Sequence, residues 1–290
     1  MSDSNHGEIP EAVKFATGNG GLPKVVVETP SSTAEIYLNG AHVTHFQKKG
    51  EEPLLFLSRA SEFTAGKAIR GGVPIIFPWF GGREGLPAHG FARNVQWEFK
   101  TQTLHTNGSI SLHFHLPSIE FFEVEYIVTV GDSLTMELIV GNTSDKDSVF
   151  ETCLHTYFAI GAIDSISITG LTGCSYMDKV EPGDFTETAE SIRIASEVDR
   201  VYTDTTATVE IIDPSMGRRI RVEKSGSHST VVWNPWIAKS KAMADFGDEE
   251  YLQMVCVESG NIAANKITLS PGAGAAMKVV LSSEALGWCP

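Results

Sequence analysis

Apolar and polar residues alternate along short runs over most of the chain, and turn-forming residues separate the runs. Alternation with a period of two is typical of strands that bury one face. Residues 122–130 and 133–140 alternate most regularly, and the Gly131-Asp132 pair between them indicates a β-hairpin. The predicted strands cover residues 24–29, 34–38, 42–46, 109–116, 122–130, 133–140, 207–212, 219–222, 230–233 and 277–281.

Helical patterns are few in this chain. Only residues 237–244 and 248–252 have a helix-compatible pattern, and both segments are short. Many short strands without long amphipathic helices favour an all-β fold, a large antiparallel β-sandwich, over alternating strand–helix units. No composition break or flexible linker divides the chain. We therefore expect one domain over residues 21–290, preceded by a loosely ordered segment over residues 1–20.

The composition is that of an ordinary globular protein: 42% of the 290 residues are hydrophobic and 20% are charged. The net charge of -14 argues against nucleic-acid or anionic-membrane partners, because both require a basic surface. No run of 18 apolar residues predicts a membrane helix, and the N-terminus lacks the pattern of a secretory signal. The four cysteines show neither metal-binding spacing nor a disulfide framework, so a reducing, cytoplasmic location is expected.

Two apolar runs about a hundred residues apart each contain one titratable side chain. In the run 153–158, His155 shares a strand face with Cys153 and Tyr157. Glu258 follows the run 253–257 and is expected at the end of a strand, just before the turn formers Ser259-Gly260. A carboxylate and an imidazole from two strand ends can act as general base and general acid on one small molecule. Taken singly, a histidine in an apolar strand is usually a packed core or rim residue, and a glutamate at a strand end is usually solvated.

The segments 69–81 and 86–94 are rich in glycine, proline and aromatic residues, with Arg70 and Arg93 at their outer ends. Glycine and proline specify a backbone closely while disfavouring helix and central strand, so a rigid functional loop is predicted. Each arginine has a planar fork suited to carboxylate or phosphate. Pairing of each arginine with a local Asp or Glu is the structural alternative.

Six segments together resemble a known family. They are IRGGVPIIFPWFG (69–81), LPAHGFARN (86–94), LHTYF (154–158), EVDRVY (197–202), VVWNPW (231–236) and VESGN (257–261). In this order and at these distances they resemble the aldose 1-epimerase-like superfamily, and more closely its glucose-6-phosphate 1-epimerase branch. The likeness extends from about residue 23 to about residue 281. It implies a galactose mutarotase-like supersandwich that interconverts the anomers of a hexose 6-phosphate with no metal or organic cofactor.

The resemblance also assigns roles to particular residues. It implies that Glu258 is the base and His155 the acid, and it implies a substrate-binding set of Arg70, His89, Arg93, Asp199 and Trp236. Trp79 and Trp233 are further candidates for aromatic walls, with core packing as the alternative. One position departs from the family pattern, because Ala88 stands where the family commonly has Gln before the histidine. This departure bears on the identity of the hexose and not on the type of reaction.

Three other functions are compared with this one. A mutarotase for unphosphorylated aldoses would use the same acid–base pair but would not require Arg70 and Arg93. A glycoside hydrolase would require two carboxylates flanking the bond. A non-catalytic carbohydrate-binding sandwich would give no reason for His155 and Glu258 to converge.

His113 and His115 share a strand face without accompanying ligands in a zinc pattern, so no metal is expected. The expected partner is a small-molecule sugar phosphate, and the chain is expected to be a monomer or a weak homo-oligomer.

Overall fold

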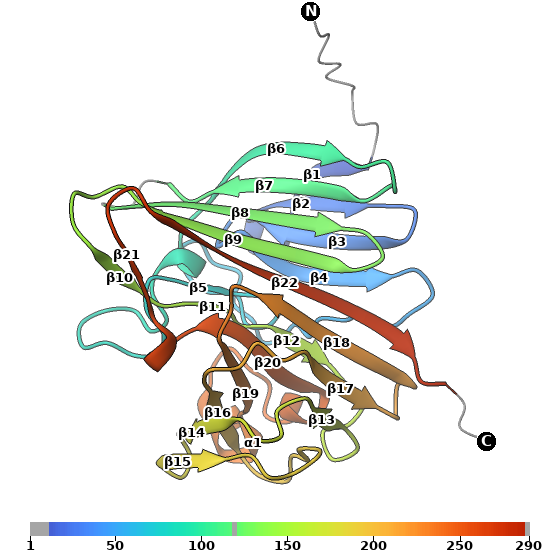
Figure 1. The fold of residues 1–290 in the computed structure, drawn as a ribbon. Coiled ribbons are helices and arrows are strands. Elements are labelled where there is room, and N and C mark those ends of the chain that lie inside the picture. The colour runs from blue at the N-terminus through green and yellow to red at the C-terminus, as the bar shows by residue number, and fades with distance from the viewer. Residues whose placement is uncertain (1–11, 118–120, 288–290) are drawn as a thin grey trace, which may run out of the picture.

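The computed structural model describes residues 12–117 and 121–287, and these residues form mainly antiparallel sheets (Figure 1). Within these ranges one α-helix occurs, α1 (Trp236–Ala242). Four 3-10 segments are also present: Asn19–Gly21, Ala92–Asn94, Glu250–Gln253 and Ala263–Asn265. The expectation of an all-β sandwich with few short helices is confirmed, and both predicted helical segments overlap observed ones.

The first eight-stranded sheet is arranged in the order β13-β17-β18-β22-β9-β8-β7-β6. Its strands are β6 (Glu98–Leu104), β7 (Ile110–His115), β8 (Phe122–Val130), β9 (Leu134–Asn142), β13 (Ser167–Thr169), β17 (Val209–Asp213), β18 (Arg218–Ser225) and β22 (Gly274–Ala285). In β8 and β9 buried and half-buried residues alternate, as expected for a sheet with one face on the core. The predicted hairpin between them is present, with Val130 opposite Leu134.

The second eight-stranded sheet is arranged in the order β15-β14-β16-β19-β20-β11-β5, and β12 also pairs with β20. Its strands are β5 (Ile75–Ile76), β11 (Thr152–Leu154), β12 (Tyr157–Ala159), β14 (Ser175–Asp178), β15 (Gly183–Thr186), β16 (Val198–Tyr202), β19 (Ser229–Asn234) and β20 (Met254–Asn261). Every residue of β19 and β20 is buried. Both faces of this sheet are therefore covered at its centre.

A four-stranded sheet and a two-stranded one complete the fold. The larger contains β1 (Val13–Thr17), β2 (Pro23–Glu28), β3 (Ser32–Tyr37) and β4 (His42–Lys48), and the smaller pairs β10 (Ser148–Phe150) with β21 (Ile267–Leu269). The expectation of a loosely ordered segment over residues 1–20 does not hold for β1, because β1 pairs with β2 along its length. The Phe15 ring also packs edge-on against Phe99. Residues 1–11 of that expectation lie outside the described residues.

Strand β20 divides its side chains between two apolar clusters. Val255 and Val257 point into the large core shared by the sheets, whereas Cys256 belongs to a second cluster on the opposite face. Strand alternation places Glu258 on the same face as Cys256. We call this the site face of the sheet. The expectation that Glu258 ends its strand is wrong, because β20 continues through Ser259-Gly260 to Asn261.

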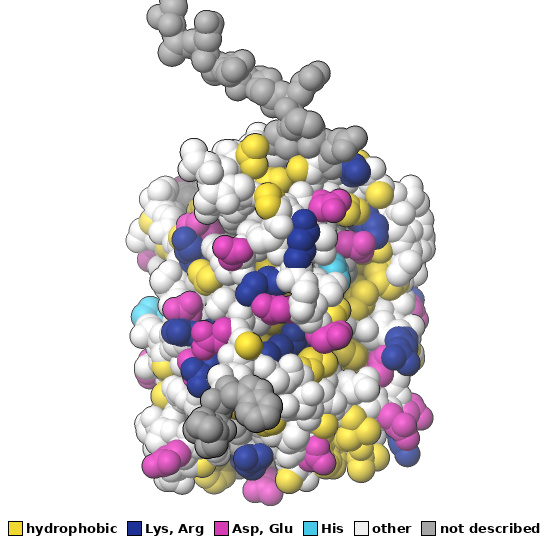
Figure 2. Space-filling view, turned by 90° about the vertical axis from the view of Figure 1, so that its right-hand side faces the viewer, with side chains coloured by type: hydrophobic (Ala, Val, Ile, Leu, Met, Phe, Trp, Pro, Cys, Tyr) yellow, Lys and Arg dark blue, Asp and Glu magenta, His cyan; other side chains and the backbone are white. Residues whose placement is uncertain are grey.

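Charged side chains of both signs are intermixed on the face shown in Figure 2, without a large patch of one sign. Ion pairs join charged side chains of neighbouring strands in the sheet that contains β17, β18 and β22, such as Arg219 with Glu210 and Glu284. Among the described residues no helix is long and apolar enough to cross a membrane.

Candidate active site

Glu258 and His155 meet on the site face. The His155 Nε2 atom lies 3.2 Å from Glu258 Oε1. Glu258 is in the interior of β20, and His155 lies in the short break between β11 and β12, two strands that both pair with β20. The His155 amide donates to the Pro74 carbonyl at 3.1 Å, which fixes the break against the loop before β5. The structure thus brings the two predicted residues into direct contact.

The pair is more deeply buried than a solvent-facing cleft would allow. The side chains of His155 and Glu258 are 10% and 1% exposed. Burial raises the pKa of the Glu258 carboxyl well above its usual range, and the Asp199 charge adds to that rise. Burial lowers the pKa of the His155 imidazole well below its usual range, with the neighbouring His89 and two arginines adding to the effect. Both shifts favour uncharged forms, so the resting pair carries one transferable proton between a carboxyl group and a neutral imidazole.

Aromatic rings fix the orientation of the imidazole. The His155 ring stacks on Tyr157 with ring centroids 4.8 Å apart and an interplanar angle of 13°. The edge of Trp233 faces the same imidazole at 5.9 Å. Of the two tryptophans in the segment 231–236, Trp233 therefore borders the acid–base pair. The Trp236 ring instead packs against Tyr251, with ring centroids 5.2 Å apart. No ring contact within the described part of the chain places Trp236 beside His155, so its substrate contact stays a prediction.

Two buried thiols flank Glu258. Cys153 donates from Sγ to Glu258 Oε2 at 3.5 Å across the β11–β20 pair. Cys256 precedes Glu258 by two residues on the same strand face, and burial raises the pKa of both thiols well above the usual range. The sequence already placed Cys153 on the face of His155, but its contact with Glu258 depends on strand pairing. The register of β11 against β20 is what aligns them.

Asp199 reaches the site face from β16, opposite Trp233 of β19. Its carboxylate lies between two ammonium groups: Lys179 Nζ is 3.9 Å away and Lys239 Nζ is 3.7 Å away. Lys179 Nζ also lies 4.5 Å from the centroid of the Phe80 ring. Lys179 was not identified from the sequence, because it follows β14 in an ordinary hairpin and only the fold carries it to this place.

His89 lies in the loop between β5 and the 3-10 segment Ala92–Asn94, with a positive φ of 64°. The Gly81 amide donates to its Nδ1 at 3.3 Å, so the neutral ring carries its proton on Nε2. Burial lowers its pKa to about 3, with nearby cations contributing. Its ring centroid is 5.8 Å from that of His155. His89 is therefore a neutral donor beside the acid–base pair.

The backbone after His89 is fixed by close contacts. Gly90 has a φ of 72°, and a side chain there would meet the Phe77 carbonyl oxygen at 2.0 Å. The Phe91 amide donates to the same carbonyl at 3.0 Å. Only glycine fits this approach, and the loop consequently holds His89 in one place.

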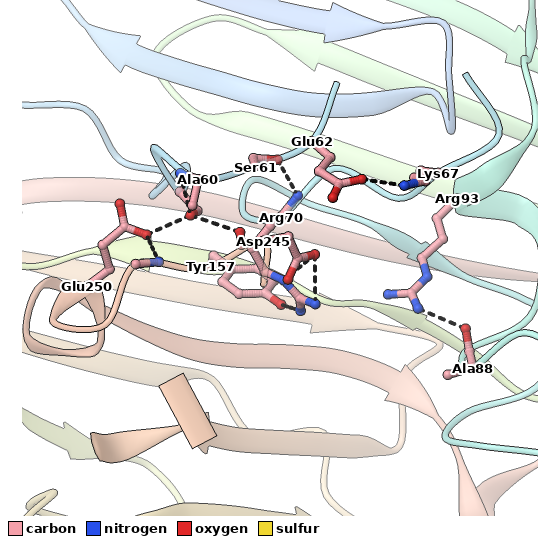
Figure 3. A network of polar contacts seen from close by, with 12 residues as sticks. Ala60, Ser61, Glu62, Lys67, Arg70, Ala88, Arg93, Tyr157, Asp245 and Glu250 are labelled. Carbon is pink, nitrogen blue, oxygen red and sulfur yellow. Dashed lines mark hydrogen bonds and ion pairs between the residues drawn. The ribbon is translucent and has the colours of Figure 1, made fainter. Parts of the chain in front are cut away.

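Arg70 is already engaged by protein groups. Its Nη1 donates to the Tyr157 hydroxyl at 3.0 Å, and its Nε and Nη2 lie 3.2 and 3.1 Å from Asp245 Oδ2. Figure 3 shows its guanidinium between these two partners. Asp245 is 175 residues away in sequence, so this pairing was not predictable from local sequence. Arg70 thus links the loop before β5 to Tyr157, on which the His155 imidazole stacks.

Arg93 is less completely paired. Its Nη2 donates to the Ala88 carbonyl at 2.8 Å, as Figure 3 shows, while its buried Nε has no hydrogen-bond partner among the described residues. Arg70 and Arg93 line one cavity of about 350 Å³, together with Lys67, Ala88 and Asp245. We call this the arginine cavity. It has the size of a small-ligand site. Arg83, another cation of the intervening loop, instead stacks on Trp79 at 4.9 Å.

Among the described residues, one histidine–cysteine–carboxylate group has its ligand atoms mutually within 4.8 Å, and it consists of His155, Cys256 and Glu258. The histidine pair weighed in the sequence analysis does not form such a group. His113 Nε2 pairs with Glu125 at 3.2 Å, and His115 Nδ1 lies 4.0 Å from Glu98.

The chain is similar over most of its length to proteins of one family. The family profile described as aldose 1-epimerase matches residues 23–282. A protein of Cenchrus ciliaris named "putative glucose-6-phosphate 1-epimerase" is 37% identical over 287 residues, covering 93% of this chain and 87% of its own. A protein of Escherichia coli with the same name is 37% identical over 247 residues, covering 82% and 83%. The crystal structure of a "putative mutarotase" from Salmonella typhimurium superimposes with a TM-score of 0.88 at 30% identity, covering 96% of this chain and 95% of that one.

Proposed function

The chain belongs to the aldose 1-epimerase family, and we propose that it interconverts the α and β anomers of a hexose 6-phosphate, with glucose 6-phosphate as the first candidate. It is an enzyme of the mutarotase type. The named relatives support the phosphorylated substrate, and the arginine cavity supports it from the geometry of this chain.

The 3.2 Å contact between His155 Nε2 and Glu258 Oε1 is the observation that carries the proposal. In a pyranose the C1 hydroxyl oxygen and the ring oxygen are bonded to the same carbon, so the groups that serve them must be adjacent. Glycoside hydrolases instead keep their two carboxyl groups about 5 Å apart or more. The adjacency of Glu258 and His155 therefore favours ring opening over hydrolysis.

The proposed reaction uses the one transferable proton of the pair. With that proton on His155, Glu258 removes the proton of the C1 hydroxyl, the bond between C1 and the ring oxygen breaks, and His155 protonates the ring oxygen. The product is the open-chain aldehyde. Rotation about the C1–C2 bond presents the other carbonyl face, and closure occurs with the two side chains in exchanged roles. Because the pair finishes with the same proton count, no cofactor needs to regenerate it.

Substrate groups around the reacting carbon have separate candidate partners. The neutral His89 offers an Nε2 donor to a reacting oxygen, and Asp199 offers a carboxylate to sugar hydroxyls beside Lys179. The small, hydrogen-bond-incompetent side chain of Ala88 stands where the family commonly has Gln. A hydroxyl contact that Gln would make is absent from that position, which bears on hexose preference and leaves the acid–base chemistry unaffected.

The phosphate is assigned to the arginine cavity. Arg93 and Arg70 both line it, and the buried Arg93 Nε has no hydrogen-bond partner in the part of the chain that the structure describes. Lys67 is in the same cavity, although Glu62 pairs with its ammonium group at 2.5 Å. Against a net charge of -14, a local group of cations is required to hold a dianion. A mutarotase for free aldoses is the second candidate, and its substrate would offer these cations no anion to bind.

Exchange NMR with the unaltered protein tests the proposal directly. The rate of α to β exchange is measured for glucose 6-phosphate and for glucose at equal concentrations. We expect much faster protein-dependent exchange of the phosphorylated sugar. Equal exchange of both sugars would instead establish the free-aldose mutarotase. Protein-dependent exchange of neither sugar, with binding retained, would establish a carbohydrate-binding protein.

A further inference from the structure

The acid–base pair has a third neighbour that the reaction does not use. Cys256 Sγ, a ring nitrogen of His155 and a carboxylate oxygen of Glu258 lie within 4.8 Å of one another, and all three residues are buried. The His155 nitrogen next to Glu258 is Nε2, at 3.2 Å from Oε1. A thiol, an imidazole and a carboxylate are ligands of borderline and soft divalent cations, and zinc above all accepts this combination. Hard cations such as Mg²⁺ prefer oxygen ligands alone.

The backbone holds these three groups in a fixed arrangement. Cys256 and Glu258 are two residues apart on β20, so both project from one face of a central strand. His155 is fixed from the other side by its amide bond to the Pro74 carbonyl and by stacking on Tyr157. Sites built on such rigid elements hold a ligand geometry more closely than sites on loops.

We propose that His155, Cys256 and Glu258 form a binding site for Zn²⁺ or a similar soft divalent cation, and that the bound cation inhibits the enzyme by occupying the acid–base pair. Three protein ligands leave one tetrahedral position for water. The metal would bond to the imidazole Nε2, to the carboxylate and to the thiolate. The thiol and the carboxyl group each release one proton to solvent, while the neutral imidazole releases none.

The surroundings of the site indicate a reversible inhibitor instead of a permanently held ion. A histidine that binds a resident metal almost always donates its second ring nitrogen to a carboxylate, a carbonyl group or water. His155 Nδ1 is buried with no such partner among the described residues. Glu258 does have outer support, from the Cys153 thiol at 3.5 Å. The arginines near the pair also disfavour an added positive charge.

Cobalt binding tests the site without any sugar, so its outcome is independent of the proposed reaction. Co²⁺ is added to the reduced full-length protein, and absorption by a thiolate-to-cobalt charge-transfer band is recorded. We expect a saturable band with one equivalent bound, displaced by Zn²⁺. Cys256→Ala should remove the band, and Cys174→Ala, which alters a half-buried thiol outside the trio, should retain it. A wild-type protein without the band at saturating Co²⁺, or a folded Cys256→Ala protein that keeps it, would overturn the proposal.

A second measurement covers the case in which Cys256→Ala does not fold. Cys256→Ser keeps the size of the buried side chain. Loss of an outer-shell partner of a metal site typically costs about 10- to 100-fold in metal affinity, so loss of a direct thiolate ligand should weaken Zn²⁺ binding by at least that factor. In the unaltered enzyme, Zn²⁺ should also slow anomer exchange in competition with the sugar, and a chelator should restore the rate. Unchanged zinc affinity in folded Cys256→Ser, or zinc inhibition that excess sugar does not relieve, would contradict the assignment.

Discussion

The acid–base pair and the arginine cavity lie close together but are built differently. Glu258 and His155 are held by central strands that are covered on both faces, and each contacts its neighbours at fixed register. The arginine cavity is lined by loop residues, and its guanidinium groups belong to segments outside the strands. The pair is nearly closed to solvent, whereas Arg70 and Arg93 are half-buried.

This difference suggests that separate parts of the molecule carry out the proposed proton transfer and select the substrate. Groups on a rigid sheet hold the geometry that proton transfer requires, and a small displacement there is costly. Groups on loops can change with less consequence for the fold, because few backbone hydrogen bonds depend on them. In the proposed function, the type of reaction depends on β20 and its partner strands, and the preference for a phosphorylated sugar depends on the loops around Arg93. Substitutions should therefore have different effects in the two regions.

The largest effect is expected at the acid–base pair. Glu258→Gln and His155→Asn should each lower anomer exchange by about 10²–10⁴-fold, the usual contribution of a general acid or base. Both replacements keep the side chain polar and similar in size, because both positions are buried. The exchange rate is measured by NMR, and folding by circular dichroism. Glu125→Gln on the other sheet is the matched control and should be silent. Near-normal exchange in a folded variant would remove that residue from the proposed chemistry.

A smaller and more selective effect is expected in the arginine cavity. Arg93→Ala removes charge-assisted hydrogen bonds to phosphate worth about 1.5–3 kcal/mol, so KM for glucose 6-phosphate should rise roughly 10- to 150-fold. Exchange of free glucose should change little, and added salt should weaken the phosphorylated substrate selectively.

Arg83→Ala is the control for this substitution, because it removes the same charge from a side chain stacked on Trp79. Its KM should stay within a small factor of that of the unaltered enzyme. Equal losses for both sugars in Arg93→Ala would assign Arg93 to the general architecture of the site and favour the free-aldose mutarotase.

The pH profile should reveal the link between Asp199 and the pair. In the proposed reaction the one-proton form is active, so activity should fall at low pH when His155 gains a proton and at high pH when Glu258 loses its own. Since the Asp199 charge raises the pKa of Glu258, Asp199→Asn should lower that pKa and move the alkaline limb to lower pH. The acid limb should stay in place. Asp184→Asn on the exposed β15 is the control, and an alkaline limb unchanged in Asp199→Asn would show that Glu258 does not set it.

The smallest effect is expected from the thiol that supports Glu258. A neutral hydrogen bond contributes about 0.5–1.5 kcal/mol, so Cys153→Ala should lower kcat roughly two- to tenfold with KM unchanged. Cys153→Ser restores a donor and should recover part of the rate. Cys174→Ala serves as the control. A change in KM alone would indicate an altered binding surface and not a displaced carboxylate.

Regular alternation made the sheets predictable, whereas long-range pairing decided the details of the site. The β8–β9 hairpin follows from its own residues, and the pairing of His155 with Glu258 was anticipated through the family resemblance. The strand end after Glu258 was mispredicted because Ser259-Gly260 resembles a turn. In the structure, a side chain at Gly260 would lie 2.5 Å from the Thr152 carbonyl oxygen. This glycine thus permits close strand contact inside β20.

Other site features have no local signal at all. Asp245 pairs with Arg70, and Lys179 pairs with Asp199, through contacts between segments distant in sequence. Trp236 shares the segment 231–236 with Trp233, yet only Trp233 borders the imidazole. The side chains of neighbouring aromatic residues diverge because Asn234 ends the strand and Trp236 begins α1 with a φ of 53°.

Tyr157 joins the two regions through one ring. Its hydroxyl accepts from Arg70, and its face supports the His155 imidazole. An anion that draws the Arg70 guanidinium toward itself therefore also acts on the ring against which the imidazole rests. Binding free energy from a remote part of the substrate can then raise kcat, because the contact of the anion with Arg70 would help to orient the His155 imidazole. A substrate analogue that lacks the anion would in consequence be processed slowly even when it saturates the enzyme.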